Sequence, residues 1–273
     1  LRVVFDDYGS QGLVDAGLVI KSESESTNFY DRFRNRLMFP IFTFQGEVIG
    51  FGARSFDNEQ PKYLNSPETE IFLKSSELYG IFQARKEIQK TRQVIVVEGY
   101  MDVISLSENR IINVVASLGT SFTSQQFIKL VRIAEKIVFM FDGDDAGNKA
   151  AKRAMMIILT EIKPGLEISF VFLPDGNDPD SFVSSYGAEK LNTCISSAMP
   201  LSEMILKTIE EYGDQNTVEG RTKIVKNALE IFDVIPEGIF KNQIIFETTN
   251  RFEFFDERIS KQKRTSFKTR KKP

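Results

Sequence analysis

From residue 93 onward, strand-like runs alternate with helical segments, and this alternation constrains the fold more than any other feature of the sequence. The strand-like runs are short, rich in β-branched and aromatic residues, and apolar on both faces, as buried strands are. They span residues 94–97, 111–117, 136–141 and 168–173. The segments between them carry apolar residues at helical spacing and span residues 100–108, 123–135 and 145–162. The pattern predicts an α/β unit, a parallel sheet with helices on its faces.

Acidic pairs follow three of the four predicted strands. Ligands of such sheets bind outside the carboxyl ends of the strands, so the residues found there decide the chemistry. The pairs are Glu98 with Asp102, Asp142 with Asp144, and Asp178 with Asp180. Because the carboxyl ends of parallel strands meet at one edge of the sheet, we expect these six carboxylates to lie close together.

Two explanations compete for these acids. One acid near a helix N-terminus often only caps the helix, a contribution of about 0.3–1 kcal/mol, and this suffices for any single residue of the six. Five or six converging carboxylates, however, would repel one another and raise their own pKa values unless divalent cations compensate them. Segment 142–147 does not match a calcium-binding EF-hand loop, because Ala146 and Arg153 occupy its fifth and twelfth positions.

Composition narrows the chemistry further. The chain has no histidine and one cysteine, Cys194, which excludes histidine-dependent triads and clustered zinc sites and predicts no bound zinc. The cofactor predicted from the acids is Mg²⁺, with Mn²⁺ as the alternative, acting on phosphate oxygens in phosphoryl or nucleotidyl transfer. No apolar stretch is long enough to span a membrane, and the first residues do not show a basic region followed by an apolar one, so we expect a cytoplasmic protein without membrane partners.

The remaining segments differ from the α/β unit in pattern and charge. Residues 1–92 are mixed, with a hairpin expected around Gln45 and Gly46 and a helix over 75–89. Within them, residues 29–92 have a net positive charge, and Arg and Lys are interleaved with Phe and Tyr. Taken alone, this pattern is more typical of a solvated face, and it favours a surface for single-stranded nucleic acid only together with the acidic pairs and the family resemblance described below. The fold class we predict is therefore α/β in its centre and α+β overall. The four predicted parts are a partial basic subdomain at 1–92, the metal-binding unit at 93–183, a helical subdomain at 184–260 and a basic tail or linker at 261–273.

The acidic pairs and several longer strings together resemble a known family. The Glu98, Asp142 and Asp144 pattern resembles the Toprim domain of primases, topoisomerases and some nucleases. The longer strings are similar, in order and spacing, to the RNA-polymerase core of bacterial replicative primases of the DnaG type. These strings are YDRFRNRLMFPI, VIGFGARSF, PKYLNSPETEIFLK, LYGIFQARK, VVEGYMDVISL, FDGDDAGNKAA and LPDGNDPDSFV. Where the family often has FHKG, this chain has Phe72, Leu73, Lys74 and Ser75.

The resemblance implies template-directed synthesis of short RNA primers on single-stranded DNA from ribonucleoside triphosphates, in DNA replication. By similarity, Glu98, Asp142 and Asp144 are catalytic, and they form the metal site with Asp178, Asp180 and Asp102. The nucleotide- and template-binding residues it implies are Arg54, Lys62, Tyr63, Asn65, Lys74, Arg32 and Arg34. The implied partners are a replicative helicase, through a domain absent from this N-terminally truncated chain, and a single-stranded DNA-binding protein within the primosome.

Three other functions remain open at this point. A Toprim nuclease or topoisomerase would cut rather than join, and a topoisomerase needs a nucleophilic tyrosine on a further domain. A primase–helicase fusion needs a P-loop, and the sequence has no GxxxxGK[ST]. A replication scaffold without catalysis would have no need of intact acidic pairs.

Overall fold

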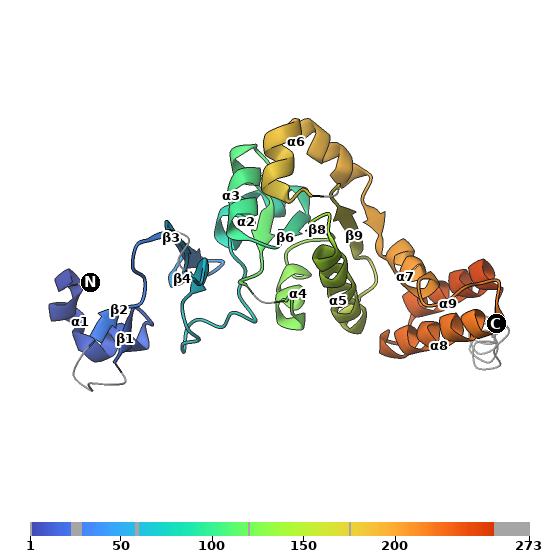
Figure 1. Ribbon diagram of the computed structural model, residues 1–273, viewed down its shortest axis with the longest axis horizontal. Coiled ribbons are helices and arrows are strands. Elements are labelled where there is room, and N and C mark those ends of the chain that lie inside the picture. Colours follow the sequence, from blue (N-terminus) through green and yellow to red (C-terminus); the bar gives the residue numbers. More distant parts are fainter. Residues whose placement is uncertain (1, 23–28, 58–59, 120, 175, 254–273) are drawn as a thin grey trace, which may run out of the picture.

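A five-stranded sheet forms the centre of the molecule (Figure 1). The computed structural model describes residues 2–22, 29–57, 60–119, 121–174 and 176–253. In sheet order, the strands are β10 (Met199–Pro200), β9 (Glu167–Phe172), β8 (Lys136–Phe141), β6 (Gln93–Val97) and β7 (Val114–Ala116). Strands β6 to β9 pair in parallel, as predicted, and β10 joins the edge antiparallel to β9.

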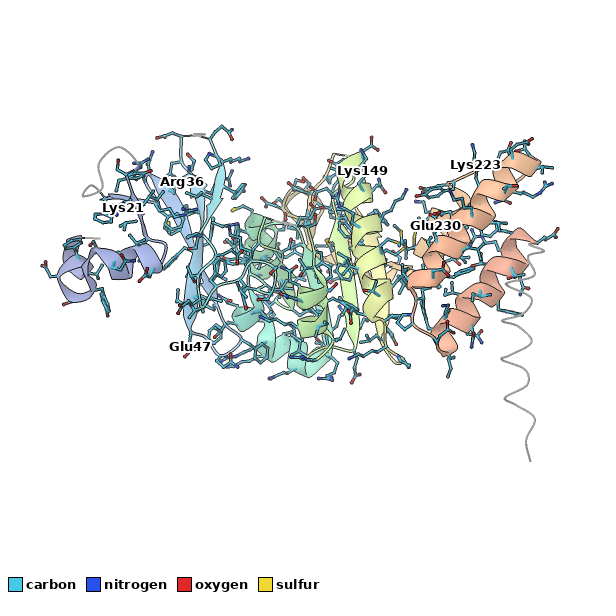
Figure 2. All side chains as sticks on the ribbon, turned by 90° about the horizontal axis from the view of Figure 1, so that it is seen from below. Lys21, Arg36, Glu47, Lys149, Lys223 and Glu230 are labelled. Atoms are coloured by element: carbon cyan, nitrogen blue, oxygen red, sulfur yellow. The ribbon has the colours of Figure 1, made fainter. Side chains whose placement is uncertain are left out.

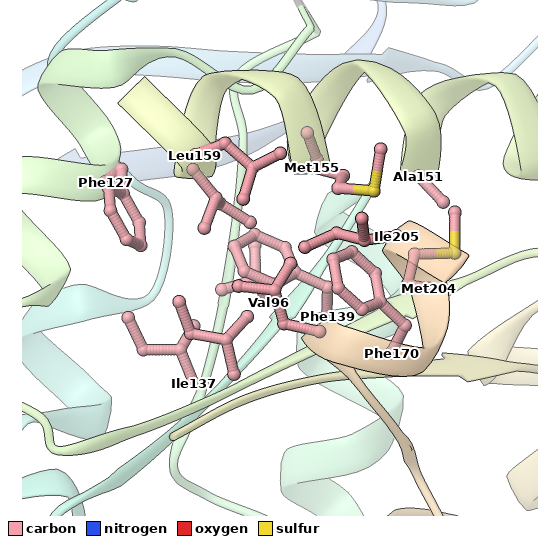
Figure 3. Packing of buried hydrophobic residues seen from close by; sticks show 14 of the residues in the cluster. Val96, Phe127, Ile137, Phe139, Ala151, Met155, Leu159, Phe170, Met204 and Ile205 are labelled. Atoms are coloured by element: carbon pink, nitrogen blue, oxygen red, sulfur yellow. The ribbon is translucent and has the colours of Figure 1, made fainter. Parts of the chain in front are cut away.

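Helices cover both faces of this sheet. On one face lie α3 (Tyr100–Glu108) and α6 (Pro179–Ser196), and on the other lie α2 (Ile81–Thr91), α4 (Ser124–Leu130) and α5 (Asp145–Glu161). Alternate strand residues point to opposite faces, so Val96, Phe139 and Phe170 pack beneath α5 (Figure 3). Because α3 follows β6 and α5 follows β8 on opposite faces, a crevice opens between the carboxyl ends of these two neighbouring strands.

The N-terminal part, blue in Figure 1, lies beyond the β7 edge of the sheet. Its elements are α1 (Arg2–Asp15), β1 (Val19–Lys21), β2 (Phe29–Asp31), β3 (Arg36–Phe42), β4 (Val48–Ser55) and β5 (Tyr63–Asn65). Strands β3, β4 and β5 form an antiparallel sheet, and the predicted hairpin around Gln45 and Gly46 joins the first two. Its apolar face packs on the central unit, where Phe39 stacks on Tyr100 with ring centroids 5.2 Å apart.

Three helices follow the sheet at the C-terminal side, within the segment predicted to be helical. They are α7 (Leu201–Glu210), α8 (Val218–Val234) and α9 (Ile239–Phe252). Apolar residues of all three, among them Ile205, Ile224 and Ile244, are continuous with the core beneath α5. None of the helices in the described residues is long and apolar enough to span a membrane.

The structure differs from the sequence prediction in several places. The helix predicted over 75–89 begins only at Ile81, because Gly80 has a positive φ of 82° and Tyr79 pairs with Ala116 at the sheet edge. Strand β7 and helix α4 are shorter than their predicted ranges. Strand β10 comes from the segment 184–260, which we predicted to be helical. The predicted basic tail, 261–273, lies outside the described residues.

Candidate metal centre and nucleic-acid interface

The parallel sheet brings the predicted acidic residues to one edge. Glu98 follows β6 directly and Asp142 follows the neighbouring strand β8 directly. Asp102 lies in the first turn of α3, and Asp178 precedes α6, which starts after β9, the strand on the other side of β8. The prediction that these residues share one edge therefore holds for the backbone that carries them.

Three of the carboxylates also cap helices, so the capping explanation is correct for part of the set. The side chain of Asp144 accepts a 2.7 Å hydrogen bond from the Gly147 N–H, and that of Asp178 accepts one of 2.7 Å from the Ser181 N–H. The Asp102 carboxylate accepts a 2.9 Å bond from the N–H of Gly99. The Asp102 carboxylate also accepts a hydrogen bond from the backbone of Asp180, in the first turn of α6. The capping bonds of Asp144 and Asp178 each use one carboxylate oxygen, Oδ1.

Glycine at position 143 lets the β8 and β9 loops approach each other closely. A Cβ at Gly143 would lie 2.3 Å from the carbonyl oxygen of Leu173, well inside van der Waals contact. The Gly143 N–H donates a 3.1 Å hydrogen bond to the carbonyl of Asn177, next to Asp178. The loop between β8 and α5 is thus fixed against the loop that carries the third acidic pair.

The charges of these acids oppose one another. Burial, followed by repulsion from Glu98, Asp178 and Asp144, raises the pKa of Asp142 to about 6. Burial, followed by repulsion from Asp142, raises the pKa of Asp102 to about 7. Glu98 is exposed as a residue, yet desolvation of its carboxyl group and then the charge of Asp144 raise its pKa. The negative charges of these acids are therefore not fully compensated by the residues around them.

The donor atoms fit a hard divalent cation. The Oδ1 atom of Asp142 is buried without a hydrogen-bond partner among the described residues, a costly state that a cation would relieve. Every acidic side chain here offers oxygen, the donor that Mg²⁺ and Mn²⁺ prefer. Within the described ranges, no three acidic or cysteine side chains converge closely enough to hold one ion as they stand. Side-chain rotation at this edge would have to complete such a site.

A crevice of about 330 Å³ opens beside Glu98, between the loop after β7 and helix α5. Its apolar floor includes Phe122 and Phe139, and its rim carries Glu98, Ser117 and Arg153. The charge of Arg153 acts on Glu98 and opposes the rise in its pKa. Our sequence analysis used Arg153 only to exclude an EF-hand loop and did not assign it to the site. It lies two turns into α5, and the helical periodicity after β8 was the one signal that could have placed it near the strand end.

Three of the predicted nucleic-acid residues, Arg54, Tyr63 and Asn65, lie on the strands of the N-terminal sheet, and Lys62 directly precedes β5. Arg54 is on β4, paired with Tyr63 of β5, and the cationic groups of Arg54 and Lys62 lie 5.9 and 5.8 Å from the Tyr63 ring centroid. Arg34 lies 5.0 Å above the exposed ring of Tyr30. Cations beside accessible rings are the combination that suits unstacked bases and phosphates.

Other predicted members of this surface are engaged in protein contacts. The guanidinium of Arg32 donates bonds of 3.2 and 3.1 Å to the carbonyl of Asn65. The side chain of Asn65 is bonded to Tyr100 and to the carbonyl of Leu118, in the central unit. The backbone of Lys74 bonds to the side chains of Glu68 and Gln126. The analysis of the sequence missed Tyr100, although it directly follows the Glu98–Gly99 pair.

The cations and the strand ends face the same side of the molecule. In Figure 2, Arg36 of β3 and Lys149 of α5 both lie along the upper edge, whereas Glu47 in the β3–β4 turn lies at the lower edge. Arg54 and Tyr63 belong to the Arg36 end of their sheet, because Arg36 pairs with Ser55. Lys149 lies in the second turn of α5, close to the β8 carboxyl end.

Known proteins share both halves of this arrangement. Residues 3–85 match the family model "DNA primase catalytic core, N-terminal domain", and residues 95–183 match the model "Toprim-like". The DNA primase of Haemophilus influenzae is 40% identical over 247 residues, which cover 90% of this chain and 41% of that protein. This chain thus spans less than half the length of that relative.

Solved structures give the same result. A DNA primase domain from Pseudomonas aeruginosa superposes with a TM-score of 0.88 at 36% identity, over 94% of this chain and 82% of that one. A DnaG primase catalytic domain bound to single-stranded DNA superposes with a TM-score of 0.85 at 38% identity, over 93% of this chain and 80% of that one. The chain belongs to the family of bacterial DnaG-type DNA primases, within which it corresponds to the catalytic core.

Proposed function

We propose that this chain carries out template-directed synthesis of short RNA primers on single-stranded DNA, by metal-dependent nucleotidyl transfer. The observation that carries the proposal is the pairing of two surfaces on one side of the molecule. One is the acidic edge at Glu98 and Asp142, and the other is the cationic and aromatic surface at Arg54 and Tyr63. The related catalytic domain bound to single-stranded DNA supports it.

The acidic edge is the proposed metal site. Asp142, with its unpartnered buried oxygen, would be the central ligand, together with Glu98 and Asp144. Asp178, Asp180 and Asp102 would complete the site, and Mg²⁺ is the proposed ion. A bound divalent cation would stabilise charge on the phosphate oxygens of the reacting nucleotide. The raised pKa of Glu98 suits it to accept the proton of the primer 3′-hydroxyl.

The N-terminal sheet is the proposed template and nucleotide surface. Arg54, Lys62 and Arg34 would contact phosphates, and the exposed rings of Tyr63 and Tyr30 would stack on bases. We include Lys74, which lies in the segment that follows β5. Arg32 would act indirectly, through the strand that it holds.

The wider setting is also a proposal. We propose that the whole protein works in the cytoplasm with a replicative helicase, which would bind a domain outside this chain. A single-stranded DNA-binding protein would be the further partner at the template. Both follow from the membership of the chain in the primase family.

The test of this function distinguishes joining from cutting, because the same metal chemistry can drive attack by a sugar hydroxyl or by water. Purified protein at high concentration should incorporate labelled ribonucleotides into short RNA on single-stranded DNA with Mg²⁺, and EDTA should stop this. Glu98→Gln should abolish incorporation, while Glu108→Gln, at the far end of α3, should not. Digestion of the template by the wild type, lost in Glu98→Gln and without any RNA product, would establish the nuclease function instead.

Template binding should depend on Arg54 and Lys62. Replacing either by Ala should weaken single-stranded DNA binding by about three- to tenfold, and each should lower the slope of log affinity against log salt by about 0.7, because one phosphate contact is lost. Fluorescence anisotropy at several salt concentrations measures both. Lys90→Ala is the matched control, since Lys90 is an exposed cation near the end of α2, at the amino ends of the strands. An unchanged salt slope in Arg54→Ala and Lys62→Ala would contradict this placement.

A further inference from the structure

The side chain of Asn65 joins the N-terminal sheet to two parts of the central unit. Its Oδ1 atom accepts a 2.6 Å hydrogen bond from the Tyr100 hydroxyl, and its Nδ2 atom donates a 2.9 Å bond to the carbonyl of Leu118. Asn65 lies at the end of β5, and the guanidinium of Arg32 donates two hydrogen bonds to the backbone carbonyl of Asn65. One amide thus connects three elements that are distant in sequence.

Both partners of this amide lie beside the proposed catalytic edge. Tyr100 is the first residue of α3, between Glu98 and Asp102. Leu118 lies in the loop after β7, and its neighbours Ser117 and Gly119 line the crevice next to Glu98. A shift of the Asn65 amide would therefore displace the start of α3 and one wall of that crevice.

The surroundings leave little room for these groups to move. Tyr100 is only 5% exposed, and its ring lies between Phe39, stacked at 5.2 Å, and Tyr63, stacked at 6.4 Å. A Cβ at Gly52 would lie 2.4 Å from the Tyr100 ring, and one at Gly119 would lie 3.1 Å from the Asn65 amide nitrogen. Close packing on both sides fixes the geometry of the bridge.

We propose that Asn65 is a positioning residue, which fixes the template surface of β5 relative to Glu98 through its bonds to Tyr100 and Leu118. This inference rests on the proposed primase function and refines it, because Asn65 then acts through Tyr100 rather than on the nucleotide. Tyr63, two residues earlier on the same strand, and Glu98, two residues before Tyr100, are the groups whose separation the bridge sets. Misplacement of reacting groups by about 1 Å can cost about a hundredfold in rate.

A double-mutant cycle tests the proposal on primer synthesis. Asn65→Ala and Tyr100→Phe should each lower kcat by about tenfold to a hundredfold, with KM for the ribonucleotide changed less than about threefold. The double variant should be no slower than the slower single variant, because both changes break one bridge. A rise in KM for Asn65→Ala, with losses that multiply in the double variant, would mean that Asn65 contacts the nucleotide itself and would overturn the proposal.

A second measurement does not depend on activity. Hydrogen exchange of the peptide covering residues 117–122 should be faster in Asn65→Ala than in the wild type, since the loop loses its amide donor. Asn113→Ala is the matched control, because its amide donates a comparable 3.0 Å bond to the carbonyl of Gln93 at the amino ends of β6 and β7, away from Glu98; it should leave kcat unchanged. An exchange rate in Asn65→Ala equal to that of the wild type would refute the bridge.

If wild-type protein makes no RNA, the proposed function fails, while the exchange result still decides whether the bridge exists. Should Asn65→Ala not fold, the kcat and KM of Tyr100→Phe decide the proposal, because that variant keeps the packed ring.

Discussion

Asp142→Asn should lower the rate of ribonucleotide incorporation by at least about a thousandfold and at the same time stabilise the metal-free protein. The loss of rate follows because the amide has no negative charge and only one oxygen, so it is a much weaker central ligand for the proposed metal ion than the carboxylate. The gain in stability follows from the raised pKa of Asp142, which records repulsion and desolvation that the neutral amide does not suffer. Because Asp142 is partly exposed, we expect a gain of about 1–2 kcal/mol in the free energy of unfolding at pH 8.

Incorporation of labelled ribonucleotides measures the first effect, and urea unfolding in EDTA measures the second. Asp145→Asn is the matched control, since Asp145 is an exposed carboxylate in the first turn of α5, three residues away. It should leave the rate within about threefold of the wild type. A marked loss of stability in Asp142→Asn would show that the carboxylate has a structural role, contrary to our assignment.

The affinity for Mn²⁺ should fall by at least about tenfold between pH 8 and pH 5. Cations bind the ionised carboxylates, and Asp142 and Asp102, with pKa values raised to about 6 and about 7, take up protons in this range. Isothermal titration calorimetry in several buffers would measure both the affinity and the protons released on binding. Asp102→Asn should make the dependence on pH weaker, and an affinity that does not change with pH would contradict the proposed ligands.

The same shifts fix the sign of the effect of pH on stability. Since the native state binds more protons than the unfolded state between about pH 4 and pH 7, these two groups make the metal-free protein less stable as pH rises through that window. Saturating Mn²⁺ at pH 8 should restore the stability, because the cation takes the place of the protons. Thermal unfolding at pH 5.5 and pH 8, with and without the ion, compares the four states.

The sheet and its acidic edge could be predicted because the signals are local in the sequence. The alternation of apolar strand-like runs with helical segments predicts where β6 and β8 lie in the sequence. Acidic residues come directly after both strands, so no knowledge of distant contacts is required. Strand β10 could not be predicted in this way, because its two residues, Met199 and Pro200, are too few to show the alternation of apolar and polar residues that marks a strand. Its place depends on the edge of β9, which only the assembled sheet provides.

The bridge at Asn65 shows where sequence patterns are insufficient. Tyr100 and Leu118 are 35 and 53 residues away along the chain, so no spacing rule connects them to Asn65. A polar residue in a cationic, aromatic segment is typical of a nucleic-acid contact, and this pattern does not distinguish it from an interdomain hydrogen bond. The start of α2 is a similar case, because the pairing of Tyr79 with Ala116 outweighs a local helical preference.

The double use of acids at the sheet edge has a consequence for how such chains diverge. Asp144 and Asp178 start helices through their side chains, whereas the buried Oδ1 of Asp142 bonds to nothing in the described residues. In a descendant that had lost catalysis, selection for helix capping would still favour Asn, Ser or Thr at positions 144 and 178. Position 142 would be free to become apolar, since its charge only destabilises the metal-free fold. A hydrophobic residue there, beside retained capping residues, would therefore mark a member of this lineage that keeps the architecture without the reaction.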